Sequence, residues 1–155
     1  MSAVLELPAT VGETFMLRVH FSDDEIRAFA TTVRDFNPLH HDLAAAKAQG
    51  YRGLIASGTQ LGSVFMAMTA THFAKPTADG RQRLGLGMGF DIRFRAPVYP
   101  DEDIDLRWTV TSIEWKESLA GWIMRLEGDA RSTERLLLSG TGTLLLRAPT
   151  RGGAP

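Results

Sequence analysis

A change of hydrophobic period about halfway along the chain constrains the fold most strongly. Within residues 58–74, apolar side chains recur at the spacing of one helical face. Small residues between them would let a neighbouring backbone come close, so we expect a long helix enclosed by strands. The apolar positions are Leu61, Val64, Phe65 and Met68, and the small ones are Gly58, Gly62, Ser63, Ala67 and Ala70.

From residue 90 onward, apolar and polar residues alternate one by one, which is the pattern of half-buried strands. One similar strand precedes the helical part of the chain. The order of strand, helices and antiparallel meander predicts an α+β fold. The predicted strands are 15–21, 90–95, 104–111, 121–130 and 135–147, with polar turns at 115–118 and 131–134.

Two shorter helices are predicted between the first strand and the long helix. Ser22 and Glu25 have the spacing of a capping box, and a helical apolar face follows them. Pro38 disfavours helical geometry at the residue before it, so this helix should end near Asp35. Asp42 can cap a second short helix that Gly50 closes.

Composition excludes several classes of protein. The 155 residues fit one domain, which we place at 1–148 with a flexible tail at 149–155. With 17 Lys and Arg against 18 Asp and Glu, the chain has no general positive field for nucleic acid. It has no cysteine, which removes disulfides, thiolate zinc sites and a cysteine nucleophile. The N-terminus does not resemble a signal peptide and no apolar stretch is long enough for a membrane, so we expect a cytoplasmic protein.

The segment Asp35-Phe36-Asn37-Pro38-Leu39-His40 concentrates groups that can move protons. A helix end followed by a proline turn can fold the chain back, so that Asp35 and His40 face one small volume. A carboxylate beside an imidazole could carry acid/base chemistry near neutral pH. The alternative is structural: Asp35 caps the helix end, Asn37 and Pro38 form a turn, and His40 is a satisfied polar residue.

The beginning of the long helix is a second candidate element. Gly58 permits close approach to unpaired backbone amides at the positive end of the helix dipole, where a developing oxyanion can be held. A glycine that merely suits a tight turn is the structural alternative.

Together these motifs resemble the MaoC-like dehydratases and R-specific enoyl-CoA hydratases. The resemblance rests on the sequence D-F-N-P-L-H-x-D before an I-A-x-G helix start, and on FRAPVYPDED at 94–103. It implies a hot-dog fold, in which a curved antiparallel sheet wraps a long central helix. It also implies a homodimer or larger assembly.

The resemblance implies a role for each motif residue. Asp35 and His40 would be the acid/base pair that activates water, Asn37 would orient the site, and the Gly58 amide would polarise a thioester carbonyl. The reaction would be reversible addition of water to a 2-enoyl thioester carried by coenzyme A or an acyl-carrier protein. No metal or redox cofactor is expected, and coenzyme A would enter only as part of the substrate.

Two positions depart from the family pattern. Ser57 occupies a position where many members have histidine, and Met66 one where R-specific hydratases often have serine. Ser63 lies almost one turn earlier and is a possible helper. We therefore assign Ser57, Ser63, Met66 and Arg93 as candidate substrate-binding residues.

Other polar residues are weaker candidates. His41 is expected to point away from His40, and His20 and His72 have no partner at a metal-ligand spacing. Trp108, Trp115 and Trp122 are expected in the core or an interface. Several basic residues could meet phosphates of a substrate, although a solvated charged face is the simpler interpretation of any one. These are Lys75, Arg81, Arg83, Arg93 and Arg95.

The leading hypothesis is thus an enoyl-thioester hydratase or dehydratase. A hot-dog thioesterase is an alternative within enzymes, and a non-catalytic acyl-thioester binding subunit is an alternative of a different class. The departures at Ser57 and Met66 motivate the second alternative. The acyl group, its carrier and the direction of the reaction stay open.

Overall fold

The computed structural model describes residues 7–80, 82–133 and 135–147, so the predicted tail at 149–155 lies outside the described residues. The elements in chain order are β1 (Thr14–Val19), α1 (Asp23–Thr32), the 3-10 turn η1 (Pro38–His40), α2 (Leu43–Ala48), α3 (Gly58–Ala74), β2 (Leu84–Phe94), β3 (Ile104–Lys116), the 3-10 turn η2 (Glu117–Leu119), β4 (Gly121–Ser132) and β5 (Arg135–Arg147).

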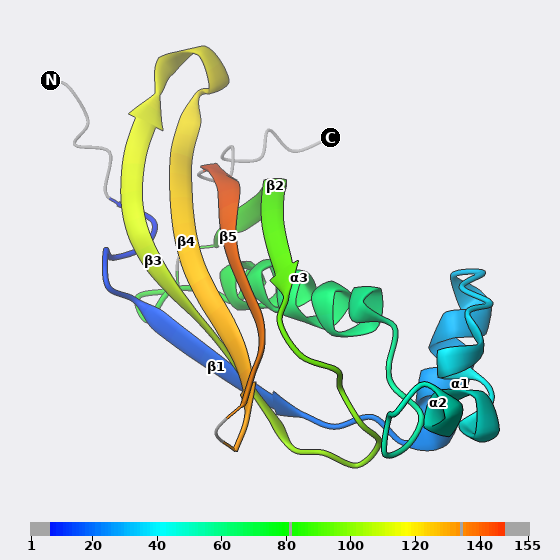
Figure 1. The fold of residues 1–155 in the computed structure, drawn as a ribbon. Helices are drawn as coiled ribbons and strands as arrows, with labels where there is room; N and C mark the ends of the chain where they lie inside the picture. Colours follow the sequence, from blue (N-terminus) through cyan, green and yellow to red (C-terminus); the bar gives the residue numbers. More distant parts are fainter. Residues whose placement is uncertain (1–6, 81, 134, 148–155) are drawn as a thin grey trace, which may run out of the picture.

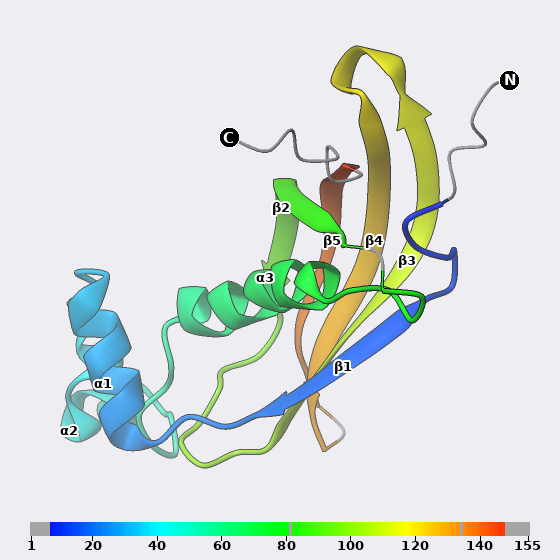
Figure 2. The same cartoon turned by 180° about the vertical axis from the view of Figure 1, so that it is seen from behind.

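The strands form one five-stranded sheet in the order β1-β3-β4-β5-β2, and its paired neighbours are antiparallel. The sheet curves around α3, while α1 and α2 lie beyond the N-terminal end of that helix (Figures 1 and 2). The prediction of a long helix wrapped by a curved antiparallel sheet is confirmed.

The core is centred on the contact between α3 and the sheet. Phe65 stacks on Trp108 of β3 with ring centroids 4.0 Å apart, and the Trp108 indole donates a 2.8 Å hydrogen bond to the Phe65 carbonyl. Gly128 of β4 makes this approach possible, because a Cβ there would lie 2.7 Å from the Phe65 ring. A buried aromatic pair with a satisfied indole therefore holds the helix against the sheet.

The small residues of α3 are arranged differently from the expectation. Gly62 is buried, but Ser63, Ala67 and Ala70 are exposed on the side away from the core. Most of the close approach is provided by glycines of the strands, because a strand glycine removes a side chain from directly beneath the helix. Of these four residues only Gly62 faces the sheet. The expectation is therefore wrong for Ser63, Ala67 and Ala70.

The strands also begin and end at different residues from those predicted. β2 begins at Leu84 instead of residue 90, through a glycine-rich stretch with a register shift between Gly87 and Gly89. β3 runs on to Lys116, so the predicted turn at 115–118 shortens and Trp115 pairs with Trp122 across the hairpin. The alternation of side chains did not reveal the early start of β2, because glycines interrupt its apolar pattern.

In the described part of the chain, no helix has the length and apolar character needed to cross a membrane.

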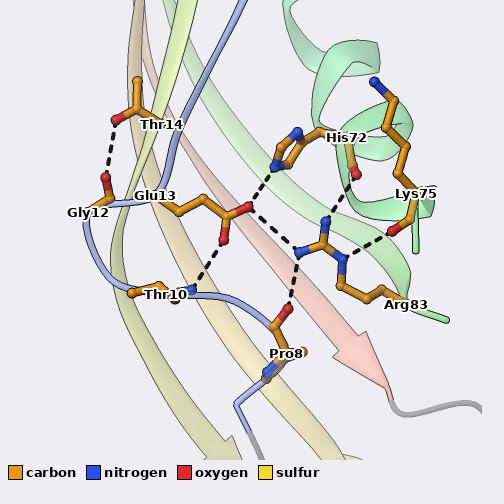
Figure 3. A network of polar contacts seen from close by, with 8 residues as sticks. All are labelled: Pro8, Thr10, Gly12, Glu13, Thr14, His72, Lys75 and Arg83. Atoms are coloured by element: carbon orange, nitrogen blue, oxygen red, sulfur yellow. Dashed lines mark hydrogen bonds and ion pairs between the residues drawn. The ribbon is translucent and has the colours of Figure 1, made fainter. Parts of the chain in front are cut away.

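A polar cluster ties the C-terminal end of α3 to the segment before β1 (Figure 3). Glu13 accepts a 2.6 Å hydrogen bond from His72, although the two are 59 residues apart in sequence. The Arg83 guanidinium lies 3.7 Å from Glu13 and donates to the carbonyls of Pro8, His72 and Lys75. His72 therefore has a carboxylate partner that sequence spacing did not reveal. The Arg83 guanidinium donates its hydrogen bonds to groups within the fold.

We expect this cluster to make stability depend on pH. Burial raises the pKa of Glu13, but the hydrogen bonds from His72 and Thr10 and the charge of Arg83 together hold this pKa below its ordinary value of 4.5. A carboxylate with a lowered folded-state pKa stabilises the fold above its unfolded pKa, and this contribution is lost as pH falls through the folded value. Glu13→Gln should cost about 1–2 kcal/mol at neutral pH, the usual contribution of a hydrogen bond to a charged group.

Thermal unfolding followed by circular dichroism would test this expectation. The melting temperature of Glu13→Gln should fall by roughly 3 °C per kcal/mol at pH 7, and the gap from the unchanged protein should narrow as pH falls below 4.5 and through the lowered pKa of Glu13 in the folded state. Glu114→Gln, at an exposed position of β3, is the matched control. A gap between Glu13→Gln and the unchanged protein that is independent of pH would contradict the assignment.

Candidate active site

The chain reverses direction immediately before the Asp35 motif. α1 ends at Thr32, three residues before the predicted end, and Arg34 adopts a left-handed conformation with φ 61°. The amides of Val33 and Asp35 then bond to the carbonyls of Phe29 and Ala30, which satisfies the helix end. The reversal at Arg34, rather than Pro38, sets the direction in which Asp35 leaves the helix.

A polar loop then brings His40 back towards Asp35. The Asn37 side chain caps η1 by accepting a 3.1 Å hydrogen bond from the Leu39 amide. The His41 ring lies 2.8 Å from the Asp35 carbonyl, and the Arg27 guanidinium donates to the His41 carbonyl. Asn37 and His41 therefore hold the loop in shape.

Asp35 and His40 form a close pair. The His40 Nε2 lies 3.2 Å from Asp35 Oδ2, with the His40 side chain 8% exposed and that of Asp35 32% exposed. The His40 Nδ1 lies 2.7 Å from the Ile55 carbonyl, and a carbonyl oxygen only accepts, so Nδ1 carries a hydrogen. The facing Nε2 and Oδ2 are close enough for a proton to pass between them.

Ser57 adds a second donor to the same carboxylate. Its hydroxyl donates to Asp35 Oδ2 at 2.8 Å, and the residue is only 3% exposed. The pKa of Asp35 is lowered, chiefly by this hydrogen bond and also by the Asn37 amide and the charges of His40 and His41, while burial opposes them. The charged form of Asp35 is therefore favoured.

A cavity opens beside the pair. Its volume is about 330 Å³, and its lining includes the predicted site residues Asn37, His40 and Gly58. The Phe94 ring covers Gly58, where a Cβ would lie 3.1 Å from the ring atoms. Apart from Tyr51, the rest of the lining is apolar, and it consists of Leu39, Ile55, Ala56, Leu61, Ala96, Pro97, Val98 and Leu137.

Gly58 is the first residue of α3, and Ser57 is its N-cap. The Ser57 side chain makes no capping hydrogen bond to the helix, because its hydroxyl is turned to Asp35. The first turn of α3 therefore has no hydroxyl cap from Ser57, and its N-terminal end at Gly58 is a candidate oxyanion site.

The other predicted substrate-binding residues lie elsewhere in the fold. Ser63 is exposed and Met66 half-buried on later turns of α3, and neither lines this cavity. Arg93 precedes Phe94 on β2, so it points to the opposite face of the sheet, where it lies 3.7 Å from Asp91. Contact between these three residues and a substrate stays a prediction.

The remaining basic candidates are also dispersed. Lys75 lines a separate cavity of about 270 Å³ between β1 and α3, and Arg95 donates to Ser139. Arg81 lies outside the described residues. Among the residues with described positions, no three His, Asp or Glu side chains are grouped so that they could hold a metal ion.

Sequence reasoning missed two contacts of Asp35. The hydrogen bonds from Ser57 and His41 join residues 22 and 6 positions from it. Ser57 had been singled out only as a departure from the family pattern, and nothing in the sequence indicated that its hydroxyl would reach the carboxylate.

Known proteins resemble this chain over most of its length. The family model described as "MaoC like domain" matches residues 6–122. The "(R)-specific enoyl-CoA hydratase" of Aeromonas caviae is 28% identical over 142 residues, which cover 90% of this chain and 95% of that protein. The mitochondrial "3-hydroxyacyl-[acyl-carrier-protein] dehydratase" of Arabidopsis thaliana is 26% identical over 138 residues, covering 88% of this chain and 76% of that protein.

The fold is also similar to that of a solved structure. The crystal structure of the MaoC-like dehydratase from Rhodospirillum rubrum superimposes with a TM-score of 0.75 at 24% identity, covering 92% of this chain and 95% of that one. The curved five-stranded sheet and its central helix are thus the hot-dog fold. Because the family model matches more than half of its residues, the chain belongs to the MaoC-like family.

Proposed function

We propose that this protein is an enoyl-thioester hydratase or dehydratase. The observation that carries the proposal is the Asp35–His40 pair, held at 3.2 Å, with His40 lining a largely apolar cavity that Gly58 also lines. The names of the Aeromonas and Arabidopsis relatives, a hydratase and a dehydratase, support the same reaction class.

The substrate would enter with its acyl chain in the cavity and its thioester carbonyl at the beginning of α3. There the Gly58 amide and the helix dipole would polarise the carbonyl, which makes C3 of the enoyl group electrophilic. The apolar lining suits a hydrocarbon chain, because burial of its surface favours binding.

A water molecule held beside the two side chains would be the nucleophile. As its oxygen bonds to C3, Asp35 accepts its proton, and the negative charge develops on the thioester oxygen near the Gly58 amide. His40 then donates its Nε2 proton to C2, which completes the addition of water. The proton on Asp35 returns to His40 across their short contact and restores the pair. Dehydration follows the same steps in reverse.

Turnover of a series of enoyl-CoA substrates tests the proposal. The unchanged protein should remove the absorbance of the conjugated thioester and form the 3-hydroxyacyl product. Asp35→Asn and His40→Ala should each lower kcat by roughly 10²–10⁴-fold, the usual contribution of a positioned acid or base, with substrate affinity largely retained. Asp24→Asn and His20→Ala, at exposed positions, are matched controls.

The alternative functions give different results in the same assay. Release of free thiol without a hydration product would indicate a thioesterase. Tight binding of acyl thioesters without turnover at any chain length, on either carrier, would indicate a binding subunit and contradict the proposal.

The role of Gly58 can be tested separately. Gly58→Ala places a methyl group 3.1 Å from the Phe94 ring and beside the proposed carbonyl site, so kcat/KM should fall at least about tenfold. Gly62→Ala is the matched control on the same helix, because its Cβ would lie 3.7 Å from the same ring, an ordinary contact. If both variants keep the kcat/KM of the unchanged protein, Gly58 has no role at the carbonyl.

We also propose that the protein assembles as a homodimer through β2. In the described sheet, β2 is an edge strand that bonds only to β5, and its 11 residues make it longer than the other edge strand, β1, with 6. β2 carries exposed apolar side chains, which favour association with a second copy. These are Leu84, Leu86, Met88 and Phe94.

Light scattering after size-exclusion chromatography tests the assembly. The unchanged protein should have about twice the 17.0 kDa mass of one chain. Leu86→Lys combined with Met88→Lys should shift the population to the monomer, because charges on the strand would have to be buried in the interface. Met16→Lys, at an exposed apolar position of β1, should leave the mass unchanged. A monomeric unchanged protein would contradict this interface.

A further inference from the structure

Ser57 and Thr59 form a short chain of hydroxyl groups that ends on the Asp35 carboxylate. The Ser57 Oγ lies 2.8 Å from Asp35 Oδ2 and 2.8 Å from the Thr59 Oγ1. Ser57 is nearly completely buried, whereas Thr59 is exposed on the first turn of α3. The chain therefore runs from the surface of the helix to the buried side of the acid/base pair.

The direction of these hydrogen bonds follows from the number of hydrogens. An ionised carboxylate only accepts, so the single hydrogen of the Ser57 hydroxyl must point to Asp35. The Ser57 oxygen can then only accept in its contact with Thr59, and the Thr59 hydroxyl must be the donor. Thr59 thus orients Ser57, and Ser57 in turn binds the charged form of Asp35.

Few other groups act on this carboxylate. Oδ2 faces Ser57 and the His40 ring, and Oδ1 receives a long 3.3 Å hydrogen bond from the Asn37 amide. The other titratable group near it is His41, whose ring lies against the Asp35 carbonyl. The Ser57 hydroxyl is therefore the short, neutral donor to this carboxylate.

We propose that Ser57, oriented by Thr59, is a positioning residue that keeps Asp35 aimed and ionised for the acid/base step. The proposal rests on the proposed hydratase function and replaces the expectation that Ser57 contacts the substrate. Its chemical consequence is the resetting of the pair: after Asp35 has taken a proton from water, the Ser57 hydrogen bond favours return of that proton to His40. Without it, the proton would remain longer on Asp35.

The direct test is the titration of the Asp35 carboxyl carbon by NMR, which requires no substrate. Loss of a hydrogen bond to a charged group should raise the pKa of Asp35 by about one unit in Ser57→Ala. Thr59→Val, at an exposed position that tolerates substitution, should raise it by a smaller amount, and Thr59→Ser should restore the value of the unchanged protein. Ser118→Ala in the β3–β4 hairpin is the control with an unrelated hydroxyl.

The activity readout is the pH profile of enoyl-CoA hydration. In Ser57→Ala the acid limb of kcat/KM should move up by about one pH unit, and kcat at neutral pH should fall roughly tenfold. If Ser57 had a purely structural role, Ser57→Ala would lower activity at every pH without moving the acid limb of the profile. Thr59→Ser, which keeps the donor, should show the limb of the unchanged protein.

The two measurements separate the failure of this inference from that of the proposed function. If no enoyl thioester is turned over but the Asp35 titration moves as expected, the hydratase proposal fails and the positioning contact stands. If Ser57→Ala and Thr59→Val both fold and both titrate like the unchanged protein, the inference is overturned, whatever the activity. Should Ser57→Ala not fold, the comparison of Thr59→Val with Thr59→Ser alone decides between these outcomes.

Discussion

The packing of α3 against the curved sheet is the constraint on which the other features depend. Phe65 can stack on Trp108 because Gly128 leaves space beneath the helix, and the Trp108 indole bonds to the backbone of the same residue. This contact sets the depth of α3 in the sheet. It thereby sets where its first turn, with Ser57 and Gly58, meets the loop from the other helices.

The candidate site is assembled from two segments that approach each other only in the folded chain. One is the loop of Asp35 and His40, shaped by the helix reversal at Arg34 and the Asn37 cap. The other is the stretch from Ile55 to Ser57 that leads into α3, where a carbonyl accepts from His40 and a hydroxyl donates to Asp35. Each side chain of the pair is therefore held by the second segment, and neither could be oriented by its own loop alone.

The two shortest carboxylate–histidine contacts among the described residues differ in what surrounds them. Glu13 and His72 are tied to Arg83, and the His72 ring stacks on Phe15 with centroids 3.9 Å apart. Asp35 and His40 have no such cationic partner among the described residues, and His40 lines a largely apolar cavity. Because the Arg83 guanidinium lies beside the Glu13 carboxylate, the Glu13–His72 contact has a structural role. The Asp35–His40 contact instead lies at a largely apolar cavity that His40 lines.

The sequence by itself determined the order of helices and strands, the α+β class and the segment that carries Asp35 and His40. These features depend on local periodicity, capping residues and a short motif. Residues close together in the sequence are enough to determine each of them. Local patterns could not place the start of β2 or the end of α1, because glycines hid the strand and Arg34 reverses the chain by backbone conformation. Only the tertiary structure decided that His72 meets Glu13, that Ser57 donates to Asp35, and that Phe94 covers Gly58. The physical reason is that these contacts join residues far apart in the chain, and the depth at which α3 packs in the sheet determines which of them come within hydrogen-bonding distance.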